Sequence, residues 1–297
     1  KGFVELKLPK NWISIPKRHE VSINNKGESK SYKFSVRSSP NESLNEISAN
    51  FYSEMKIYNY NLINLNYKHI AKSNILLPNK SIAFKINLKS NVKEVGYIKG
   101  AGDKIPESLK SIGISVSELD LSKLESYNLE KFPSIIMGIR AYNTNSLLKI
   151  KNNILWNYVK NGGNLIIQYN TSRRLKNNKI TPYKISISRD RVTNEKSIVK
   201  FLNPNHKILN YPNKISLNDF DNWVQERGLY FPNEWGNEFT PVLSMNDINE
   251  DEKKGSLLVA YYGKGAFIYT GLSFFRQLPN GIPGAYKLFV NLISHKR

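Results

Sequence analysis

The chain has 297 residues, no cysteine and a formal net charge of +20. The absence of cysteine excludes disulfides, thiolate metal sites and a cysteine nucleophile, and the length allows two domains with a core in each. Lysine and asparagine are interleaved in both halves of the chain, without the clustered basic stripe or reading module of nucleic-acid-binding proteins, so no nucleic-acid partner is expected. No run approaches the roughly 20 apolar residues that a membrane helix needs, so no transmembrane segment is expected.

Short runs of alternating apolar and polar residues fill residues 1–91 and predict β-strands. The clearest runs are residues 3–8, 21–23, 32–36 and 82–88, and residues 47–60 alternate less regularly. Several strands at this spacing, separated by turn residues, predict an all-β domain of the immunoglobulin-like sandwich type. The first run begins at the N-terminus itself, which favours a piece of a longer polypeptide or a mature form.

From residue 92 onward strands and helices alternate, which predicts an α/β domain over residues 92–297. Apolar runs predict the strands of a buried parallel sheet at residues 95–98, 114–116, 134–139 and 164–169.

Helical spacing predicts one helix after residue 147 and a last one that includes residues 286–293. The first helix is expected to be capped by Thr144 or Asn145 and to end at Gly162-Gly163. A hairpin is predicted around Gly263-Lys264-Gly265. Residues 171–240 are expected to form long, irregular insertions over the sheet edge.

The sequence Gly100-Ala101-Gly102-Asp103 follows the first strand of this domain and predicts a tight turn into a helix. Glycines at this place can cradle a phosphate, but the dinucleotide fingerprint needs a Gly or Ala where this chain has Ile105. The glycines are therefore interpreted as packing the strand against the helix, with Asp103 as a cap.

Polar side chains form four clusters, and three of the clusters begin at strand ends that should share one edge of the sheet. Aromatic rings stack on sugar faces, and planar polar groups hydrogen-bond to hydroxyls, so the clusters suit a polyhydroxylated ligand. The alternative is a polar network that fixes the long loops to the sheet, and the sequence leaves both open. The candidate ligand-binding residues are Arg140, Tyr142, Asn143, Asn170, Trp223, Gln225, Glu226, Arg227, Arg276 and Gln277.

Catalysis has one acidic candidate among these residues. Glu226 could serve as a general acid or base, although a glutamate beside Arg227 is more often ion-paired. Glycoside hydrolysis would need a second carboxylate near it, and Asp103, Asp190 and Asp221 are the candidates for that position.

Several longer strings stand out from residue 92 to the end: VGYIKGAGD, MGIRAYNT, GGNLIIQYNT, SRDRVT, FDNWVQERGLYFP, VLSMND and TGLSFFRQLPNGIPGAYKLF. Together they resemble the C-terminal part of large bacterial PIG-L-type proteins, which are similar to N-acetylglucosamine deacetylases. The string Tyr67-Lys68-His69-Ile70 and the strands around it resemble the β-sandwich that precedes this part.

The resemblance implies that residues 92–297 form a flavodoxin-like, class I glutamine amidotransferase-like domain. Active members of that class carry a cysteine on an elbow after a central strand, whereas Asn170 and Thr171 follow that strand here. Amidotransferase chemistry is therefore not expected, and a sulfur-free nucleophile would have to be Thr171 or Ser172. The zinc deacetylase domain of the family, with its His-Pro-Asp-Asp type motif, is absent from this chain, so zinc is expected only there.

We therefore expect a non-catalytic accessory segment of a PIG-L-type carbohydrate deacetylase that binds or positions a sugar-containing substrate. The alternatives are a hydrolase acting on a carbohydrate or amide with Glu226 as its acid or base, and a purely structural or assembly module. The expected partners are a carbohydrate or glycoconjugate and the deacetylase domain of the parent protein.

No cofactor or metal is expected in this chain, because His19, His69, His206 and His295 lie far apart in the sequence. The compartment stays open, with an exported location favoured over the cytoplasm.

Overall fold

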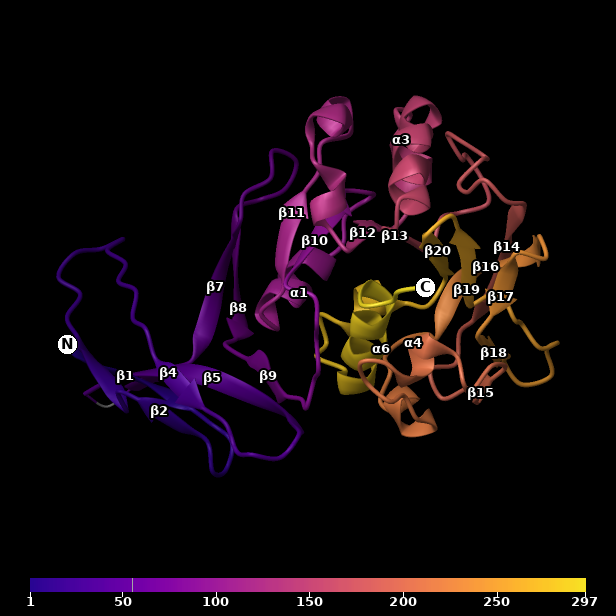
Figure 1. The fold of residues 1–297 in the computed structure, drawn as a ribbon. Coiled ribbons are helices and arrows are strands. Elements are labelled where there is room, and N and C mark those ends of the chain that lie inside the picture. The colour runs from indigo at the N-terminus through magenta and orange to yellow at the C-terminus, as the bar shows by residue number, and fades with distance from the viewer. Residues whose placement is uncertain (55) are drawn as a thin grey trace. The chain divides into compact units, whose positions relative to one another are not determined.

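The computed structural model describes residues 1–54 and 56–297, and the chain divides into two compact units, Lys1–Asn87 and Leu88–Arg297 (Figure 1). The boundary predicted at residue 91 lies slightly later than this division. Lys89 belongs to the second unit because its backbone N–H donates to Asn213 Oδ1 (2.9 Å) and its carbonyl accepts from Asn213 Nδ2 (3.0 Å). We call the two parts unit 1 and unit 2.

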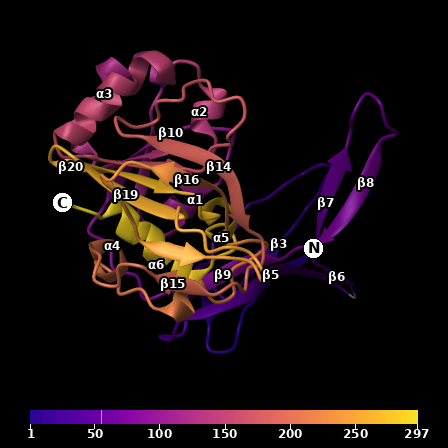
Figure 2. The ribbon, with the colours of Figure 1, turned by 90° about the vertical axis from the view of Figure 1, so that its right-hand side faces the viewer.

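Unit 1 consists of β-strands around the long strand β5 (Ser43–Ser53), as its alternating sequence predicts. Its main sheet has the order β3 (Arg18–Val21), β1 (Gly2–Lys7), β5 and β6 (Lys56–Tyr58), and β9 (Ser81–Lys85) also pairs with β5. Two separate pairs are β2 (Ile13–Ile15) with β4 (Ser35–Arg37) and β7 (Tyr60–Leu65) with β8 (Ser73–Pro78). The β7–β8 hairpin, seen in Figure 2, was not predicted.

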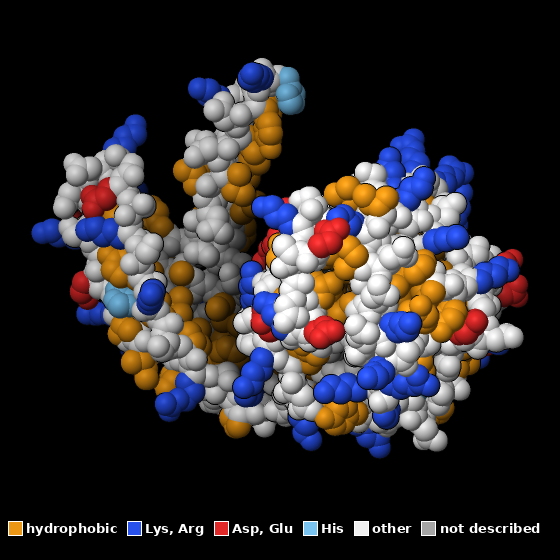
Figure 3. All heavy atoms as spheres, turned by 45° about the horizontal axis from the view of Figure 1, so that its top comes forward, with side chains coloured by type: hydrophobic (Ala, Val, Ile, Leu, Met, Phe, Trp, Pro, Cys, Tyr) orange, Lys and Arg blue, Asp and Glu red, His pale blue; other side chains and the backbone are white. Residues whose placement is uncertain are grey.

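Unit 1 buries little apolar surface among its described residues. Val21 is the one hydrophobic side chain of residues 1–54 and 56–87 that is buried, whereas Leu62 of β7 and Leu76 of β8 are 57% and 63% exposed. Figure 3 shows hydrophobic side chains spread over the surface of this unit. An immunoglobulin-like sandwich needs two sheets packed on a shared core, so that assignment stays a prediction.

Unit 2 is built on a seven-stranded sheet (Figure 1). Its order is β11 (Ser115–Glu118), β10 (Glu94–Ile98), β12 (Ser134–Met137), β13 (Asn164–Gln168), β20 (Gly265–Thr270), β19 (Leu257–Tyr262) and β17 (Phe239–Pro241). The first five strands are parallel and the last two antiparallel.

The four predicted parallel strands and the hairpin of β19 and β20 are confirmed as elements. When the five parallel strands are numbered by their order along the chain, they lie side by side in the order 2-1-3-4-5. This is one of the common strand orders of doubly wound sheets. The flavodoxin-like and amidotransferase-like names rest on the sequence resemblance and stay predictions.

Helices α3 (Leu148–Lys160) and α6 (Pro283–Ile293) cover opposite faces of this sheet (Figures 1 and 2). The predicted cap of α3 is wrong, because Leu147 stands at the N-cap without a side-chain bond. Thr144 instead ends a short preceding helix, and the Asn145 side chain donates to Lys99 O (2.8 Å). The shorter helices are α1 (Ile105–Ser111), α2 (Ala141–Thr144), α4 (Lys207–Asn210), α5 (Phe274–Gln277) and the 3-10 segments η1 (Leu121–Ser126), η2 (Leu129–Lys131) and η3 (Leu217–Phe220).

The region 171–240 contains more regular structure than predicted. Strand β14 (Ile185–Val192) pairs with β16 (Gly228–Trp235), and β15 (Val199–Phe201) pairs with β18 (Leu243–Met245). The β14–β16 ladder shifts register three times, so its sequence lacks the steady alternation by which strands are recognised. Across residues 1–54 and 56–297, the helices are all too short or too polar to cross a membrane.

Candidate functional site

The glycine turn after β10 packs this strand against the loop that follows β12. A Cβ on Gly100 would lie 2.1 Å from Ile139 O, and the neighbouring Ala101 N–H donates to that same carbonyl (2.8 Å). The Asp103 carboxylate fills the place where the strand order reverses, accepting from Tyr97 Oη (2.9 Å) and from the backbone N–H of Ile139 (3.0 Å). The turn is therefore explained without a ligand, because this carboxylate joins the carboxyl ends of β10 and β12.

Three of the predicted ligand residues turn inward at the carboxyl ends of β12 and β13. Asn170 is fully buried, and its Oδ1 accepts from the Tyr142 backbone N–H (2.9 Å). Tyr142 is also fully buried, and its hydroxyl donates to Asn152 Oδ1 (3.1 Å). The Asn143 side chain both accepts from Thr171 N–H (2.9 Å) and donates to Thr171 O (3.1 Å). These amides hold the two loops together and present no free polar group to a ligand.

Three more predicted ligand residues form a second buried network. Arg227 is 4% exposed and donates through Nε (3.1 Å) and Nη2 (2.9 Å) to Ser197 O, and through Nη1 to Phe220 O. Trp223 is 3% exposed, and its Nε1–H donates to a backbone carbonyl. Gln277 is fully buried, and it bonds both the N–H (2.8 Å) and the carbonyl (2.9 Å) of Val224. This network fixes the segment before β16 to α5.

Four of the predicted residues remain accessible: Arg140, Gln225, Glu226 and Arg276. Three of these, Arg140, Glu226 and Arg276, lie near a group of aromatic rings. Tyr169 stacks on Tyr230 with ring centroids 6.0 Å apart and lies 5.3 Å from the Phe275 ring. We call Tyr169, Tyr230 and Phe275 the aromatic platform. It lies at the carboxyl edge of the sheet, since Tyr169 directly follows β13 and Phe275 lies in α5, just after β20.

Arginine side chains flank the aromatic platform. The Arg276 guanidinium lies over the Phe275 ring, 4.8 Å from its centroid. Burial raises the pKa of Tyr169, and the positive charges of Arg140 and Arg276 oppose that rise. Arg140 lies beside Tyr169 in the fold, since its backbone N–H donates to Tyr169 O (2.8 Å). The surface combines stacking rings with planar hydrogen-bond donors.

Glu226 is engaged at this surface rather than free. Its Oε1 accepts from Arg276 Nε at 2.8 Å, and its side chain is 14% exposed. Neither Asp103, which is held at the β10 turn, nor exposed Asp221 is hydrogen-bonded or ion-paired to it in the described chain. The arrangement matches an ion pair, which is what a glutamate beside arginines forms most often.

Residues around the aromatic platform adopt left-handed backbone conformations that side chains rarely favour. Arg140 has φ 57°, Gln225 has φ 68° and Tyr230 has φ 54°. A bulky residue such as Tyr230 loses about 1–3 kcal/mol in this conformation, and such residues concentrate at functional sites. A hydrogen bond fixes the Tyr230 backbone, because its carbonyl accepts from Tyr269 Oη (2.9 Å).

Sequence reasoning named the arginines of this surface but missed Tyr169 and Tyr230 as site residues. Tyr169 ended a predicted strand, and Tyr230 lay in a region predicted to be irregular. The available signal was position, since Tyr169 stands at the same strand end as the chosen Asn170. At the elbow position, the Thr171 hydroxyl donates to Arg173 O (2.9 Å), so it is engaged with the backbone.

The described residues contain no group of three or more side chains suited to a metal ion. His206 and His295, far apart in sequence, do come together, with ring centroids 5.6 Å apart. They lie away from the aromatic platform, because His295 follows α6 beside the amino ends of β12 and β13, where Asn164 donates to its carbonyl.

No family model matches the chain, and no curated protein matches it. Solved structures that resemble part of it include a GMP synthase subunit from Thermoplasma acidophilum, with 10% identity and a TM-score of 0.43 over 69% of this chain and 94% of that chain. A β-galactosidase from Rahnella sp. R3 has 12% identity and a TM-score of 0.39, covering 66% of this chain and 31% of that chain. A β-galactosidase from Bacillus circulans sp. alkalophilus has 10% identity and the same TM-score, covering 67% and 31%. Likeness at this level assigns neither a family nor a function.

Proposed function

We propose that unit 2 is a non-catalytic binding domain that holds a carbohydrate against the aromatic platform. The observation that carries this proposal is the stacked set of Tyr169, Tyr230 and Phe275 flanked by Arg140 and Arg276 at the carboxyl edge of the sheet. Carboxyl edges of open α/β sheets are the usual place for ligands in this architecture. The platform is partly exposed at Tyr230 and Phe275, so a sugar ring can approach it.

Sugar rings suit this surface for a physical reason. Their C–H faces pack on aromatic rings, and their hydroxyls accept from guanidinium N–H groups. Arg140 has no ion-pair partner among the described side chains, so its donors are available, whereas Arg276 is shared with Glu226. We therefore assign the Arg140 guanidinium as the principal polar contact of the ligand.

Binding to an array of bacterial glycans tests the proposal. The intact chain should bind a subset of glycans, and Arg140→Ala or Tyr230→Ala should weaken that binding by about tenfold or more, since each removes one main contact. Tyr67→Ala, which removes an exposed tyrosine of unit 1, is the matched control and should leave binding unchanged. The absence of binding to any glycan by the intact chain would reject the proposal.

A purely structural role is the second candidate, and a specific observation favours it. Tyr142, Asn143 and Asn170 use their polar atoms on their own loops. The Trp223, Arg227 and Gln277 network does the same. If the structural role is the whole function, Arg140→Ala should change neither glycan binding nor the association of this chain with a deacetylase domain.

The hydrolase alternative has the weakest support. The Glu226 carboxylate is held by Arg276, and a general acid or base needs its proton-transfer oxygen free toward the substrate. The place of this chain beside a PIG-L-type deacetylase domain is part of the proposal and rests on the sequence strings alone. Co-purification of the chain with such a deacetylase domain, with and without the Arg140→Ala change, tests that partnership directly.

A further inference from the structure

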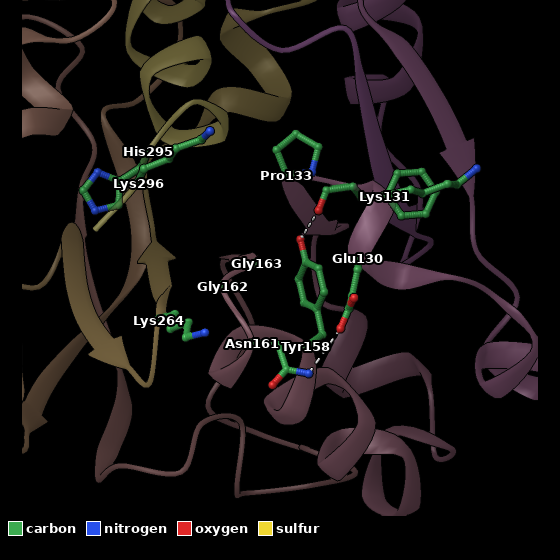
Figure 4. A pocket seen from close by; sticks show the side chains of 11 residues that line it. Glu130, Lys131, Pro133, Tyr158, Asn161, Gly162, Gly163, Lys264, His295 and Lys296 are labelled. Carbon is green, nitrogen blue, oxygen red and sulfur yellow. Dashed lines mark hydrogen bonds between the residues drawn. The ribbon is translucent and has the colours of Figure 1, made fainter.

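A separate cavity of about 640 Å³ opens at the amino ends of the parallel strands, on the edge opposite to the aromatic platform. Residues just before β12, the end of α3, the β19–β20 turn and the segment after α6 line it. Figure 4 shows Glu130, Asn161 and Tyr158 on one side of the space and Lys264, Lys296 and His295 on the other. The predicted site included none of these residues.

The walls of this cavity are fixed by buried hydrogen bonds. The Tyr158 hydroxyl donates to Phe132 O (2.9 Å), which ties α3 to the segment before β12. Ser134 Oγ donates to Ile293 O (2.8 Å), and the Asn164 side chain donates to His295 O. The backbones also approach closely, since a Cβ on Gly265 would lie 2.1 Å from Gly163 O. A cavity with such walls keeps its shape before a ligand arrives, which reduces the entropy lost on binding.

The charges around the cavity are unbalanced toward positive. Glu130 accepts from Asn161 Nδ2 (3.3 Å) on one wall. Lys131 is directed elsewhere, with its ammonium 4.5 Å from the centroid of the Phe132 ring and 3.6 Å from a carboxylate outside the cavity. Lys264 and Lys296 have no carboxylate or hydrogen-bond partner for their ammonium groups within residues 1–54 and 56–297. These two cations can therefore act on a ligand.

His295 precedes Lys296 in the chain and carries an unmet hydrogen-bonding need. It is 2% exposed, and neither of its ring nitrogens has a partner in the described chain. Its ring stacks on His206 and Tyr261, whose centroids are 5.6 and 5.7 Å away. A buried imidazole without a protein partner is unusual, and ordered water is one group that can satisfy it. The ring also lines a second cavity of about 310 Å³ beside the first.

We propose that this cavity binds the anionic group, a carboxylate or a phosphate, of a small molecule. Lys264 and Lys296 supply the positive charge for the anion's oxygens. The His295 ring stays outside the binding site, since both of its nitrogens are buried away from solvent. The Asn161 and Glu130 side chains on the facing wall are placed to bond polar groups on the remainder of the ligand. This site is independent of the aromatic platform, since the two lie at opposite ends of the parallel strands.

Calorimetric titration with inorganic phosphate and with monomeric galacturonate, at constant ionic strength, tests the proposal and separates the two anion chemistries. At least one probe should bind with one-to-one stoichiometry, and the K264Q/K296Q change should leave any heat from neutral galactose unaltered. The K264Q/K296Q double variant should weaken binding by about tenfold or more, because it removes both free charges without altering the walls. Binding of neither probe at millimolar concentration would overturn the proposal.

A variant of equal net charge separates a site from general attraction by a basic protein. K149Q/K176Q removes two exposed lysines at the other end of α3 and in the loop after β13. Its affinity should stay within about twofold of the parent, whereas equal losses in both double variants would reduce the effect to long-range electrostatics.

Discussion

Arg227 is the residue in which the binding and structural interpretations of the sequence differ most clearly. Its guanidinium donates to two backbone carbonyls and lies 5.7 Å from the Trp223 ring centroid. Burial lowers its pKa to about 10, with Asp221 and Glu195 opposing the shift. We predict that Arg227→Lys lowers the free energy of unfolding by about 2–3 kcal/mol, because an ammonium cannot reproduce the planar fork.

Urea unfolding followed by tryptophan fluorescence measures this change. Arg189→Lys, at an exposed position of β14, is the control and should stay within about 0.5 kcal/mol. If Arg227→Lys were as stable as the parent, the guanidinium would not be fixing the segment before β16. That result would favour a ligand-binding role for Arg227 instead.

His295 should make the stability of the protein depend on pH. Burial, with the nearby charges of His206 and Lys207, lowers its pKa from 6.5 to about 4. Burial lowers the pKa of His206 too. The unfolded chain therefore binds more protons than the folded one between pH 6.5 and 4, so stability is complete above pH 6.5 and falls as the pH drops toward 4. The expected loss from His295 alone is about 3 kcal/mol.

Thermal unfolding midpoints measured from pH 7 to pH 5 test this dependence, in a range that lies above the ordinary pKa values of carboxylates. The His295→Gln variant removes the titrating ring and should show a clearly shallower decline than the parent. A decline of the same steepness in both proteins would mean that other groups cause it.

Among the secondary-structure elements, the turn after β10 shows how a glycine fixes the distance between two strands. Gly100 lies against the backbone of Ile139, where a Cβ would meet the carbonyl oxygen at 2.1 Å. Backbone atoms at this contact cannot rotate away as a side chain could. We predict that Gly100→Ala lowers the free energy of unfolding by about 1–3 kcal/mol, which is the usual cost of overpacking.

The neighbouring exposed residue provides the comparison for this change. Ala101→Ser, also in the turn, should alter stability by less than about 0.5 kcal/mol. Denaturant unfolding of both variants measures the difference. Equal effects would show that the turn can move and that the close approach to Ile139 is not a constraint.

Elements differed in how far the sequence could predict them, and the reason was the regularity of their burial. Strands β12 and β13 are buried on both faces, so their apolar runs stand out. Strand β14 shifts register repeatedly against β16, and β7 is exposed throughout most of its length, so neither leaves a clear period. Tyr230 was not predicted as a site residue for the same reason, because it belongs to β16.

Site residues were harder to predict than strands because side-chain direction is a tertiary property. The sequence could place Arg140, Asn143 and Asn170 at strand ends, but not say which would turn inward. Asn143 and Asn170 bond the backbone of neighbouring loops, while Arg140 remains exposed. Amides carry both a donor and an acceptor and can satisfy loop backbone, whereas an arginine has donors alone.

At the scale of the whole molecule, the two units differ in how much buried apolar surface each has to stabilise its own fold. The buried hydrophobic core of the described chain lies almost entirely in unit 2, with Val21 as the contribution from unit 1. Unit 2 also contains the contacts that fix its own beginning, since Asn213 holds Lys89, and Asn291 Oδ1 accepts from Asn213 N–H (2.9 Å). Buried apolar area is the main favourable term in folding, so the two units should behave differently when separated.

We predict that a fragment of residues 88–297 folds alone and unfolds cooperatively, with a midpoint close to that of the full chain. A fragment of residues 1–87 should show no cooperative transition, because exposed apolar strands such as β7 and β8 cannot outweigh the entropy of ordering them. Circular dichroism during heating, with amide exchange as a second measure, distinguishes these outcomes. Cooperative unfolding of the 1–87 fragment as a monomer would contradict this division, whereas cooperative unfolding that appears only at high concentration would show that self-association covers its apolar strands.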